Sequence, residues 1–396
     1  MSKSDPVFIF DTTLRDGEQS AGVSFTLDDK IEIARDLAAM KVDVIEVGFP
    51  AASPVEQDAV AAIAREARGI RVAALARAVA SDVDAAGAAL RGAEAPRIHV
   101  FLSASEVQLR HQLRKDREQV VRMTDAMVRR ARQFTDDVEF SPMDATRADI
   151  GFVSEVVRTA LRAGATTINV PDTVGWVMPG VLSARIAELR HRVPEIEAAV
   201  ISFHGHDDLG LATANALAAI GAGVRQIEVT VNGIGERAGN TPLEEIVMAI
   251  HVHRDVLGVH TGVDTTGIQP VSHKVAAKSG LHVAANKAVV GRNAFRHASG
   301  IHQDGVVKFR ETFEILDPAQ VGNARGTEIV LGKLSGRAGF RARAEQLGLV
   351  MADAGWEAAF ERFQAIADRT REVDDAVVRT IVADTIREAG RHVSVA

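Results

Sequence analysis

Two histidines separated by a single glycine, His204 and His206, end an apolar segment of the chain. On an extended backbone, side chains two residues apart point to the same side, so both imidazoles are predicted to face one centre. That geometry suits chelation of a metal ion. The alternative is a structural pair in which Asp207 or Asp208 caps a turn.

Two other apolar segments also end in polar residues. Residues 11–19 read DTTLRDGEQ and residues 232–240 read NGIGERAGN. They supply a carboxylate and an amide that complement the two imidazoles. Such a mixed nitrogen and oxygen set suits Mg²⁺, Mn²⁺ or Zn²⁺ and leaves coordination positions open for substrate oxygens. The predicted metal ligands are Asp16, His204, His206 and Asn240.

A repeating module positions these segments. From Val7 to about Arg254, a β-branched run followed by a stretch with helical spacing occurs eight times. Parallel strands need a crossover, usually a helix, so the pattern predicts a closed (β/α)8 TIM barrel of the α/β class. A doubly wound open sheet is the alternative, but no G-x-G-x-x-G follows a strand. The strands are expected at 7–11, 42–48, 70–75, 98–102, 137–140, 167–170, 200–204 and 227–231.

Barrel closure would bring the three polar stretches together. The first strand adjoins the eighth, and the eighth adjoins the seventh, so their carboxyl ends converge on the face where barrel enzymes carry their active sites. Arg15 lies beside Asp16 in this cluster. A guanidinium next to a cation is unfavourable unless an anionic substrate lies between them, so Arg15 is predicted to hold developing negative charge. A surface ion pair with Asp16 is the alternative.

Other polar residues give weaker signals. His99, Ser141 and Thr173 lie at strand ends and could line the same cavity, although a local turn explains each of them singly. The spacing of glycines in the loop after the eighth strand matches neither common phosphate motif. Glu236 and Arg237 are expected to pair and shape that loop. The absence of side chains at its glycines would let a long ligand approach the loop backbone closely, with contacts expected at Gly233, Gly235 and Glu236.

The remainder of the chain departs from the barrel pattern. We expect a barrel domain over residues 1–260, a small linker subdomain over 261–330 and a helical subdomain over 331–396, with amphipathic stretches at 337–347, 356–369 and 375–388.

Composition narrows the functional classes. The 396 residues carry a net charge of −7 and contain neither cysteine nor tyrosine. Disulfides, thiolate metal sites and a cysteine nucleophile are therefore excluded, as is phenolic acid–base chemistry. Nucleic acid and membrane partners are not expected of an acidic chain. Because neither a secretion signal nor a long apolar run is present, a soluble cytoplasmic protein is expected.

The strings DTTLRDGEQ, HGHDDLG, NGIGERAGN and HASGIHQDG together resemble those of the 2-isopropylmalate synthase and homocitrate synthase family. Six shorter strings extend the resemblance over nearly the whole chain: GFPAAS, VEFSP, INVPDTVG, TGVDTT, NKAVVG and LGKLSGR. The resemblance implies an acyltransferase that condenses acetyl-CoA with a 2-oxo acid in a metal-dependent Claisen reaction, giving a 2-substituted malate and CoA. The barrel would then be followed by small subdomains.

The resemblance also implies roles for individual residues. It implies the same four metal ligands. It also implies that Arg15, with Gln19 nearby, stabilises the keto oxygen of the 2-oxo acid. Acetyl-CoA would be the long ligand that contacts the glycine-rich loop. His302 in GIHQDG is implied to be a catalytic histidine that the second subunit of a homodimer supplies. The implied contacts to the 2-oxo acid are His99, Ser141 and Thr173.

Several positions differ from the family pattern. Met143 stands where relatives commonly have an acidic residue, Phe313 where they have Tyr, Leu334 where they have His, and Ala298 where Glu is frequent. An apolar Met143 favours 2-oxoisovalerate, and hence 2-isopropylmalate synthesis in leucine biosynthesis. Homocitrate-, citramalate- or phosphonomethylmalate-type synthesis stays open, because a distal carboxylate or phosphonate could bind the cations at Arg110, His111 and Arg114.

Two further alternatives come from other classes. A metal-dependent lyase of the same superfamily is one, although relatives resembling hydroxymethylglutaryl-CoA lyase use a cysteine. A catalytically silent scaffold is the other, although the metal ligands are intact. No C-terminal regulatory domain is expected, and hence no leucine feedback through one.

Overall fold

A computed structural model describes residues 5–393. Contacts divide the chain into two compact units. The first comprises the chain up to residue 283 together with residues 288–290. The second comprises residues 284–287 and the chain from residue 291 onward. The three-part division expected from the sequence stays a prediction. No helix in the described part of the chain is long and apolar enough to cross a membrane.

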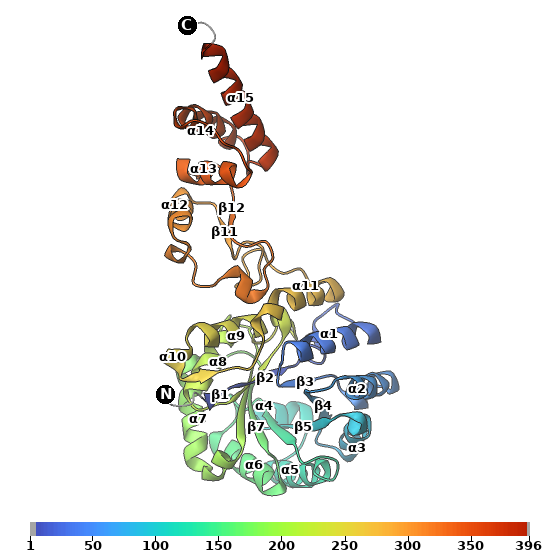
Figure 1. Ribbon diagram of the computed structural model, residues 1–396. Helices are drawn as coiled ribbons and strands as arrows, with labels where there is room; N and C mark the ends of the chain where they lie inside the picture. Colours follow the sequence, from blue (N-terminus) through green and yellow to red (C-terminus); the bar gives the residue numbers. More distant parts are fainter. Residues whose placement is uncertain (1–4, 394–396) are drawn as a thin grey trace. The chain divides into compact units, whose positions relative to one another are not determined.

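The first unit is built on a closed barrel of eight parallel strands, as predicted (Figure 1). Closure is made by the pairing of the first and last strands, with Ile9 opposite Ile227. The strands are β2 (Phe8–Asp11), β3 (Val44–Glu46), β4 (Arg71–Arg77), β5 (Ala95–Ser103), β6 (Val138–Met143), β7 (Thr167–Asp172), β8 (Val200–Gly205) and β9 (Gln226–Val229).

Helices cover the outside of the barrel. Local signals set their ends: Asp149 accepts a hydrogen bond from the Phe152 amide at the start of one helix, and Gly164, at φ 109°, ends it. The helices are α1 (Leu27–Ala39), α2 (Pro54–Glu66), α3 (Ala80–Ala89), α4 (Glu106–Gln108), α5 (Arg117–Ala131), α6 (Ile150–Ala163), α7 (Pro179–Arg192), α8 (Ala212–Gly221), α9 (Leu243–Val252), α10 (Arg254–Leu257) and α11 (Ile268–Ser279).

Two features of this unit were not predicted. A two-residue strand at its start, β1 (Asp5–Pro6), pairs in parallel with β10 (Val259–His260). The regular helix α11 lies in the segment expected to be irregular, and Lys278 on it forms an ion pair of 2.5 Å with Asp29 of α1.

The second unit contains a short parallel sheet and four helices. β11 (Arg296–His297) pairs with β12 (Glu328–Ile329), and α12 (Gly300–Lys308) lies between them in the sequence. The three amphipathic stretches form α13 (Arg337–Gln346), α14 (Asp353–Ala367) and α15 (Asp375–Val393). Their core is aromatic, with the rings of Phe340 and Phe363 stacked at 4.9 Å.

Candidate active site

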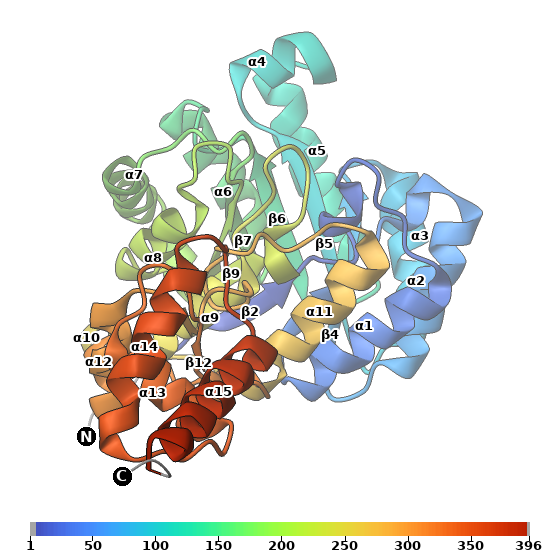
Figure 2. The ribbon, with the colours of Figure 1, turned by 90° about the horizontal axis from the view of Figure 1, so that it is seen from above.

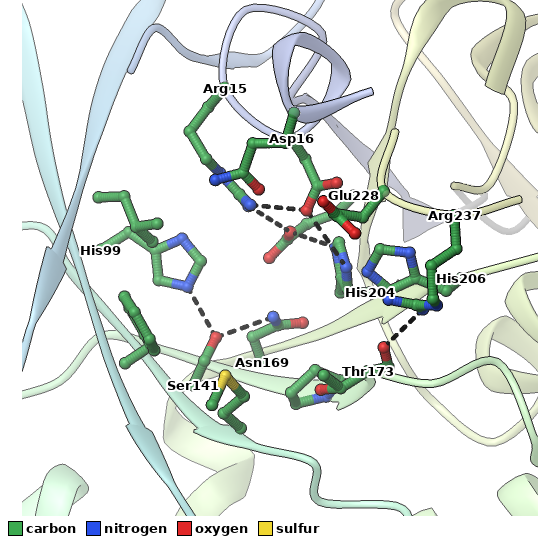
Figure 3. A pocket seen from close by; sticks show the side chains of 16 residues that line it. Arg15, Asp16, His99, Ser141, Asn169, Thr173, His204, His206, Glu228 and Arg237 are labelled. Carbon is green, nitrogen blue, oxygen red and sulfur yellow. Dashed lines mark hydrogen bonds and ion pairs between the residues drawn. The ribbon is translucent and has the colours of Figure 1, made fainter. Parts of the chain in front are cut away.

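A cavity of about 230 Å³ opens at the carboxyl ends of the barrel strands (Figure 3). Its lining combines a polar set, Arg15, Asp16, His99 and Ser141, with apolar side chains that neighbour this set on the same strands, such as Phe101 on β5 and Met143 on β6. We call the polar set the polar wall. The lining residues are Arg15, Asp16, Gln19, Leu75, His99, Phe101, Ser141, Met143, Asn169, Pro171, Thr173, His204, His206, Glu228, Glu236 and Arg237.

Three predicted metal ligands come together in this cavity. Ligand atoms of Asp16, His204 and His206 all lie within 4.8 Å of one another, and all three residues are buried. Asp16 belongs to the turn after β2, whereas the histidines belong to β8 and the residue after it. The Nε2 of His204 is 3.8 Å from Asp16 Oδ2. The arrangement can hold a divalent cation.

Outer partners orient the two imidazoles. His204 Nδ1 lies 2.8 Å from Glu228 Oε2, and His206 Nδ1 lies 3.2 Å from the carbonyl oxygen of Gly239. With each Nδ1–H donated to an oxygen, each Nε2 keeps its lone pair for a ligand. This pairing of a ligand with a carboxylate or carbonyl is the usual support of a metal-binding histidine.

Asn240, the fourth predicted ligand, lies in the same cluster. Its Nδ2 donates to Asp16 Oδ1 at 3.0 Å and to the Ile234 carbonyl at 3.1 Å. Its Oδ1 is buried and has no hydrogen-bond partner within residues 5–393. A Cβ at Gly235 would lie 2.1 Å from Asn240 Nδ2, so a glycine is needed there to admit this amide.

Electrostatics favour an ionised Asp16 and an uncharged His206. Burial opposes ionisation of Asp16, but Arg15 and then the two histidines outweigh it and hold the pKa of this carboxyl below its usual value. Burial and then the neighbouring His204 lower the pKa of His206 to about 4. For His204 burial is outweighed by Glu228, which raises the pKa of the imidazole.

A second buried network joins Arg15 and His99 within the polar wall. Arg15 Nη1 is 2.6 Å from Asp16 Oδ2, and Arg15 Nε is 2.5 Å from Glu46 Oε2. The other oxygen of Glu46 is 2.8 Å from His99 Nδ1. Although burial disfavours the charged imidazole, Glu46 raises the pKa of His99 to about 9. Both Arg15 and His99 are therefore cations held by one carboxylate.

This network sets the hydrogen-bonding role of Ser141. Its Oγ is 2.7 Å from His99 Nε2 and 2.9 Å from Asn169 Nδ2. A protonated His99 and an amide both donate, so they occupy the two lone pairs of the hydroxyl. What remains is the O–H, which can donate to an oxygen in the cavity.

Sequence reasoning missed three of these residues. Asn169 and Glu228 lie within β7 and β9, and Glu46 is the last residue of β3, whose end carries no polar stretch of the kind that follows β2 and β8. The available signal was a carboxylate or amide within an otherwise apolar strand, as in the sequence VIE of β3. Such a group is too costly to bury without a partner or a function.

The other predicted residues are placed as follows. Thr173 lines the cavity and accepts a hydrogen bond of 2.9 Å from the Asp144 amide. Gln19 and Glu236 also line the cavity, whereas Gly233 and Gly235 are not among its lining residues.

One predicted ion pair is wrong. Arg237 pairs with Asp208 at 2.7 Å rather than with Glu236, and it also donates to the carbonyl oxygen of Thr173. The side chain therefore ties the loop after β9 to the residues that follow β7 and β8.

His302 belongs to the second unit, on α12. It is exposed, and its ring stacks at 4.2 Å on Phe313, the residue that replaces the common tyrosine. The side chains of Arg110, His111 and Arg114 are exposed and do not line the cavity.

Comparison with known proteins agrees with this fold. Residues 6–275 match the family model described as HMGL-like, and residues 289–371 match the model described as homocitrate synthase post-HMGL domain-like. An HMG-CoA lyase from Bacillus subtilis superposes with a TM-score of 0.60 at 22% identity, over 72% of this chain and 98% of that one. That likeness establishes the fold. The chain is thus a barrel enzyme of the HMGL-like class.

Closer relatives refine the class. A 2-isopropylmalate synthase from Pelotomaculum thermopropionicum is 49% identical over 97% of this chain and 76% of its own length. Another from Pyrococcus furiosus is 51% identical over 96% of this chain and 76% of its own length. The chain belongs to the 2-isopropylmalate synthase family. This membership confirms the predicted resemblance and the predicted acyltransferase class.

Proposed function

We propose that this enzyme condenses acetyl-CoA with a 2-oxo acid that has an apolar side chain, 2-oxoisovalerate being the leading candidate, to give 2-isopropylmalate and CoA. The observation that carries the proposal is one cavity whose lining combines a cluster that could hold a cation, hydrogen-bond donors and apolar side chains. The proposal includes a place in leucine biosynthesis and a cytoplasmic location.

The residues fit a divalent cation. Asp16 and the two histidines offer an anionic oxygen and two imidazole nitrogens around one centre. The buried, unpartnered Oδ1 of Asn240 is an acceptor that a cation would satisfy. Mn²⁺ and Mg²⁺ are the proposed ions, with Zn²⁺ as an alternative. When bound, the cation supplies Lewis-acid polarisation of a carbonyl group.

The polar wall would bind and activate the 2-oxo acid. Arg15, fixed by Asp16 and Glu46, directs positive charge at the cavity, where it can stabilise negative charge developing on the keto oxygen. Gln19 lies beside it in the same lining. The Ser141 hydroxyl and Thr173 are the proposed contacts of the substrate carboxylate. His99 keeps the Ser141 hydroxyl in its donor orientation.

The apolar part of the lining would bind the substrate side chain. Leu75, Phe101, Met143 and Pro171 form it, and none carries a charge. Transfer of an isopropyl group from water to such a surface is favourable, whereas a distal carboxylate would lose its hydration with no cation among these four residues to replace it. This favours 2-oxoisovalerate over the dicarboxylic 2-oxo acid of a homocitrate-type reaction.

Carbon–carbon bond formation requires a base. It removes a proton from the methyl carbon of the thioester, the carbanion adds to the keto carbon of the 2-oxo acid, and the alkoxide that forms takes that proton back from the base. Water then cleaves the thioester and releases CoA. The proposed base is His302, whose imidazole is exposed and held by stacking on Phe313. We propose that the second subunit of a homodimer supplies it.

Exposed apolar side chains around α12 support such a subunit contact. Ile301 is 78% exposed, Phe309 is 60% exposed and Ile315 is 83% exposed. Mixing His302→Ala subunits with Asp16→Ala subunits should restore part of the activity, because one of the two sites then combines intact halves. Absence of rescue after demonstrated subunit exchange would contradict the dimer proposal.

The decisive assay is CoA release with acetyl-CoA, Mn²⁺ or Mg²⁺ and a panel of 2-oxo acids. The proposal predicts release that depends on both the metal and the 2-oxo acid, fastest with 2-oxoisovalerate. Cleavage of a 2-substituted malyl thioester without added acetyl-CoA would indicate the lyase alternative. Inactivity with every acid of the panel would indicate the scaffold alternative.

A further inference from the structure

A turn next to the cavity carries four cationic or titratable side chains with no partner. Within residues 5–393, the side chains of Arg110, His111, Arg114 and Lys115 make no hydrogen bond or ion pair, and all four are exposed. No acidic residue interrupts the sequence RHQLRK, although the whole chain carries a net charge of −7. We call residues 110–115 the cationic turn.

The neighbouring carboxylates are engaged elsewhere. Glu106 forms an ion pair of 2.5 Å with Arg117, and Asp149 lies 3.4 Å from the same guanidinium. Asp116 caps α5 by accepting a hydrogen bond of 2.7 Å from the Gln119 amide. The positive charge of the cationic turn is therefore not neutralised from its own surroundings.

The backbone of this turn is held in an uncommon conformation. Residues 109–113 form a π-helical turn, and Arg114 is left-handed at φ 53°. The left-handed region is unfavourable for an arginine, and such strain gathers at functional sites. Leu109, 3% exposed, anchors the turn in the core, and its carbonyl accepts the Lys115 amide at 3.3 Å.

The turn follows a strand that forms the cavity wall. His99 and Phe101 of β5 line the cavity, and the Ala104 amide donates to the Met143 carbonyl at 3.0 Å before Ser105 caps α4. The cationic turn thus lies at the mouth side of the barrel, beyond the cavity. In Figure 2, α4, which leads into the turn, projects past the neighbouring helices.

Distance separates the turn from any small substrate. None of residues 106–115 is among the residues that line the cavity. A 2-oxo acid inside a cavity of about 230 Å³ does not reach that far. Acetyl-CoA does, because a long pantetheine arm joins its thioester to a nucleotide that bears a diphosphate and a 3′-phosphate.

We propose that the cationic turn binds the phosphate groups of acetyl-CoA while the thioester enters the cavity. Arginine and lysine are the side chains that recognise phosphate, through charge-assisted hydrogen bonds. The inference rests on the proposed function, since it assumes that acetyl-CoA is the acyl donor. It also reassigns the cations that the sequence suggested for a distal carboxylate or phosphonate of the 2-oxo acid.

The test uses a variant that removes three charges and keeps the backbone: Arg110→Gln, Arg114→Asn and Lys115→Gln. Asparagine tolerates the left-handed conformation of residue 114. The matched control is Lys41→Asn, Arg68→Gln and Arg91→Gln. These three exposed cations precede the amino ends of β3, β4 and β5, at the opposite end of the barrel, and Lys41 is also left-handed, at φ 59°.

Calorimetric titration would compare CoA, 3′-dephospho-CoA and pantetheine, and kinetics would compare acetyl-CoA with S-acetylpantetheine. We expect the variant to weaken CoA binding, and to raise the KM for acetyl-CoA, by about tenfold or more at low salt, with kcat and the KM of the 2-oxo acid unchanged. Pantetheine binding and the S-acetylpantetheine kinetics should not change, and the control should behave as wild type.

Two results would overturn the inference while leaving the proposed function intact: unchanged CoA affinity in the variant, or an equal loss for CoA and pantetheine. A rise in the KM of the 2-oxo acid alone would show that the cationic turn binds the distal carboxylate or phosphonate of that substrate instead. Failure of the wild-type enzyme to bind CoA at all would instead contradict the proposed function.

Discussion

The two ends of the barrel bury polar groups in different ways. At the amino end, Arg97 Nη1 bonds to Glu139 at 2.8 Å and to Gln226 at 2.7 Å, and Gln226 Nε2 bonds to Glu139 and Ser202, each at 2.9 Å. At the carboxyl end, buried acceptor atoms of Asn240, Glu228 and Asn169 have no partner within the described part of the chain.

The difference distinguishes buried polar groups that stabilise the fold from buried polar groups that can bind a ligand. In the closed network at the amino end, every polar side-chain atom of Glu139 and Gln226 has a hydrogen-bond partner, so these groups stabilise the barrel interior. An open network leaves acceptors that only a cation, a water molecule or a substrate can satisfy. We expect substitutions at the amino end to change stability and those at the carboxyl end to change activity.

The largest effect is expected at the open end. Asp16→Asn and His204→Gln should each reduce kcat at least about 10³-fold, because the cation that polarises the substrate is lost. Far-UV circular dichroism and the melting temperature should stay near wild type, since these side chains belong to the mouth rather than to the core. His191→Gln, an exposed histidine of α7, is the control. Near-normal rates in metal-free buffer would show that the site is misassigned.

The closed end should respond in stability. Arg97→Met should lower the free energy of unfolding by about 3 kcal/mol, because it leaves the Glu139 carboxylate buried without its cation. Adding Glu139→Gln should recover much of the loss. Urea denaturation of the single and double variants measures the loss of stability in Arg97→Met and its recovery in the double variant. A loss below about 1 kcal/mol for Arg97→Met would remove the distinction between the two ends.

A pH dependence sharpens the comparison within the polar wall. The raised pKa of His99 means that its ion pair with Glu46 stabilises the fold fully below pH 6.5, and that this contribution is lost as the pH rises through about 9. The free energy of unfolding of wild type minus that of His99→Asn should therefore shrink by on the order of 2 kcal/mol between pH 6 and pH 10. A difference that does not vary with pH would contradict a charged His99.

The smallest expected effect concerns specificity. Met143→Glu should lower kcat/KM for 2-oxoisovalerate about tenfold, since a carboxylate would replace part of the apolar lining. Met143→Leu, which keeps the volume and the apolar character, should stay within about threefold of wild type. The acid panel of the CoA release assay gives both values. Equal effects of the two substitutions would show that Met143 does not contact the substrate side chain.

Periodicity predicted the fold closely. All eight barrel strands were predicted, because each apolar run had to be buried on two sides and a helical stretch separated it from the next. The pairing of β1 with β10 was missed, since two residues containing a proline, Asp5 and Pro6, carry no strand pattern. Helix α11 was missed because glycines and histidines nearby obscured its spacing.

The site was predicted only in part. His204 and His206 could be recognised because their spacing and their strand already define a chelate. Glu46 and Glu228 could not, since their partners Arg15, His99 and His204 lie far away in sequence and meet them only through barrel closure. Arg237 pairs with Asp208 rather than with the adjacent Glu236 because the barrel brings the residues after β8 next to the loop after β9. Long-range charge pairing depends on topology, which local pattern does not specify.

Anomalous diffraction from crystals grown with Mn²⁺ tests the central claim most directly. The account predicts one strong peak within coordination distance of Asp16, His204 and His206, with Asn240 Oδ1 turned toward it. A peak instead at the other buried cluster that could hold a metal in the described chain, His99, Glu139 and Glu228, or no peak at the cavity, would contradict it.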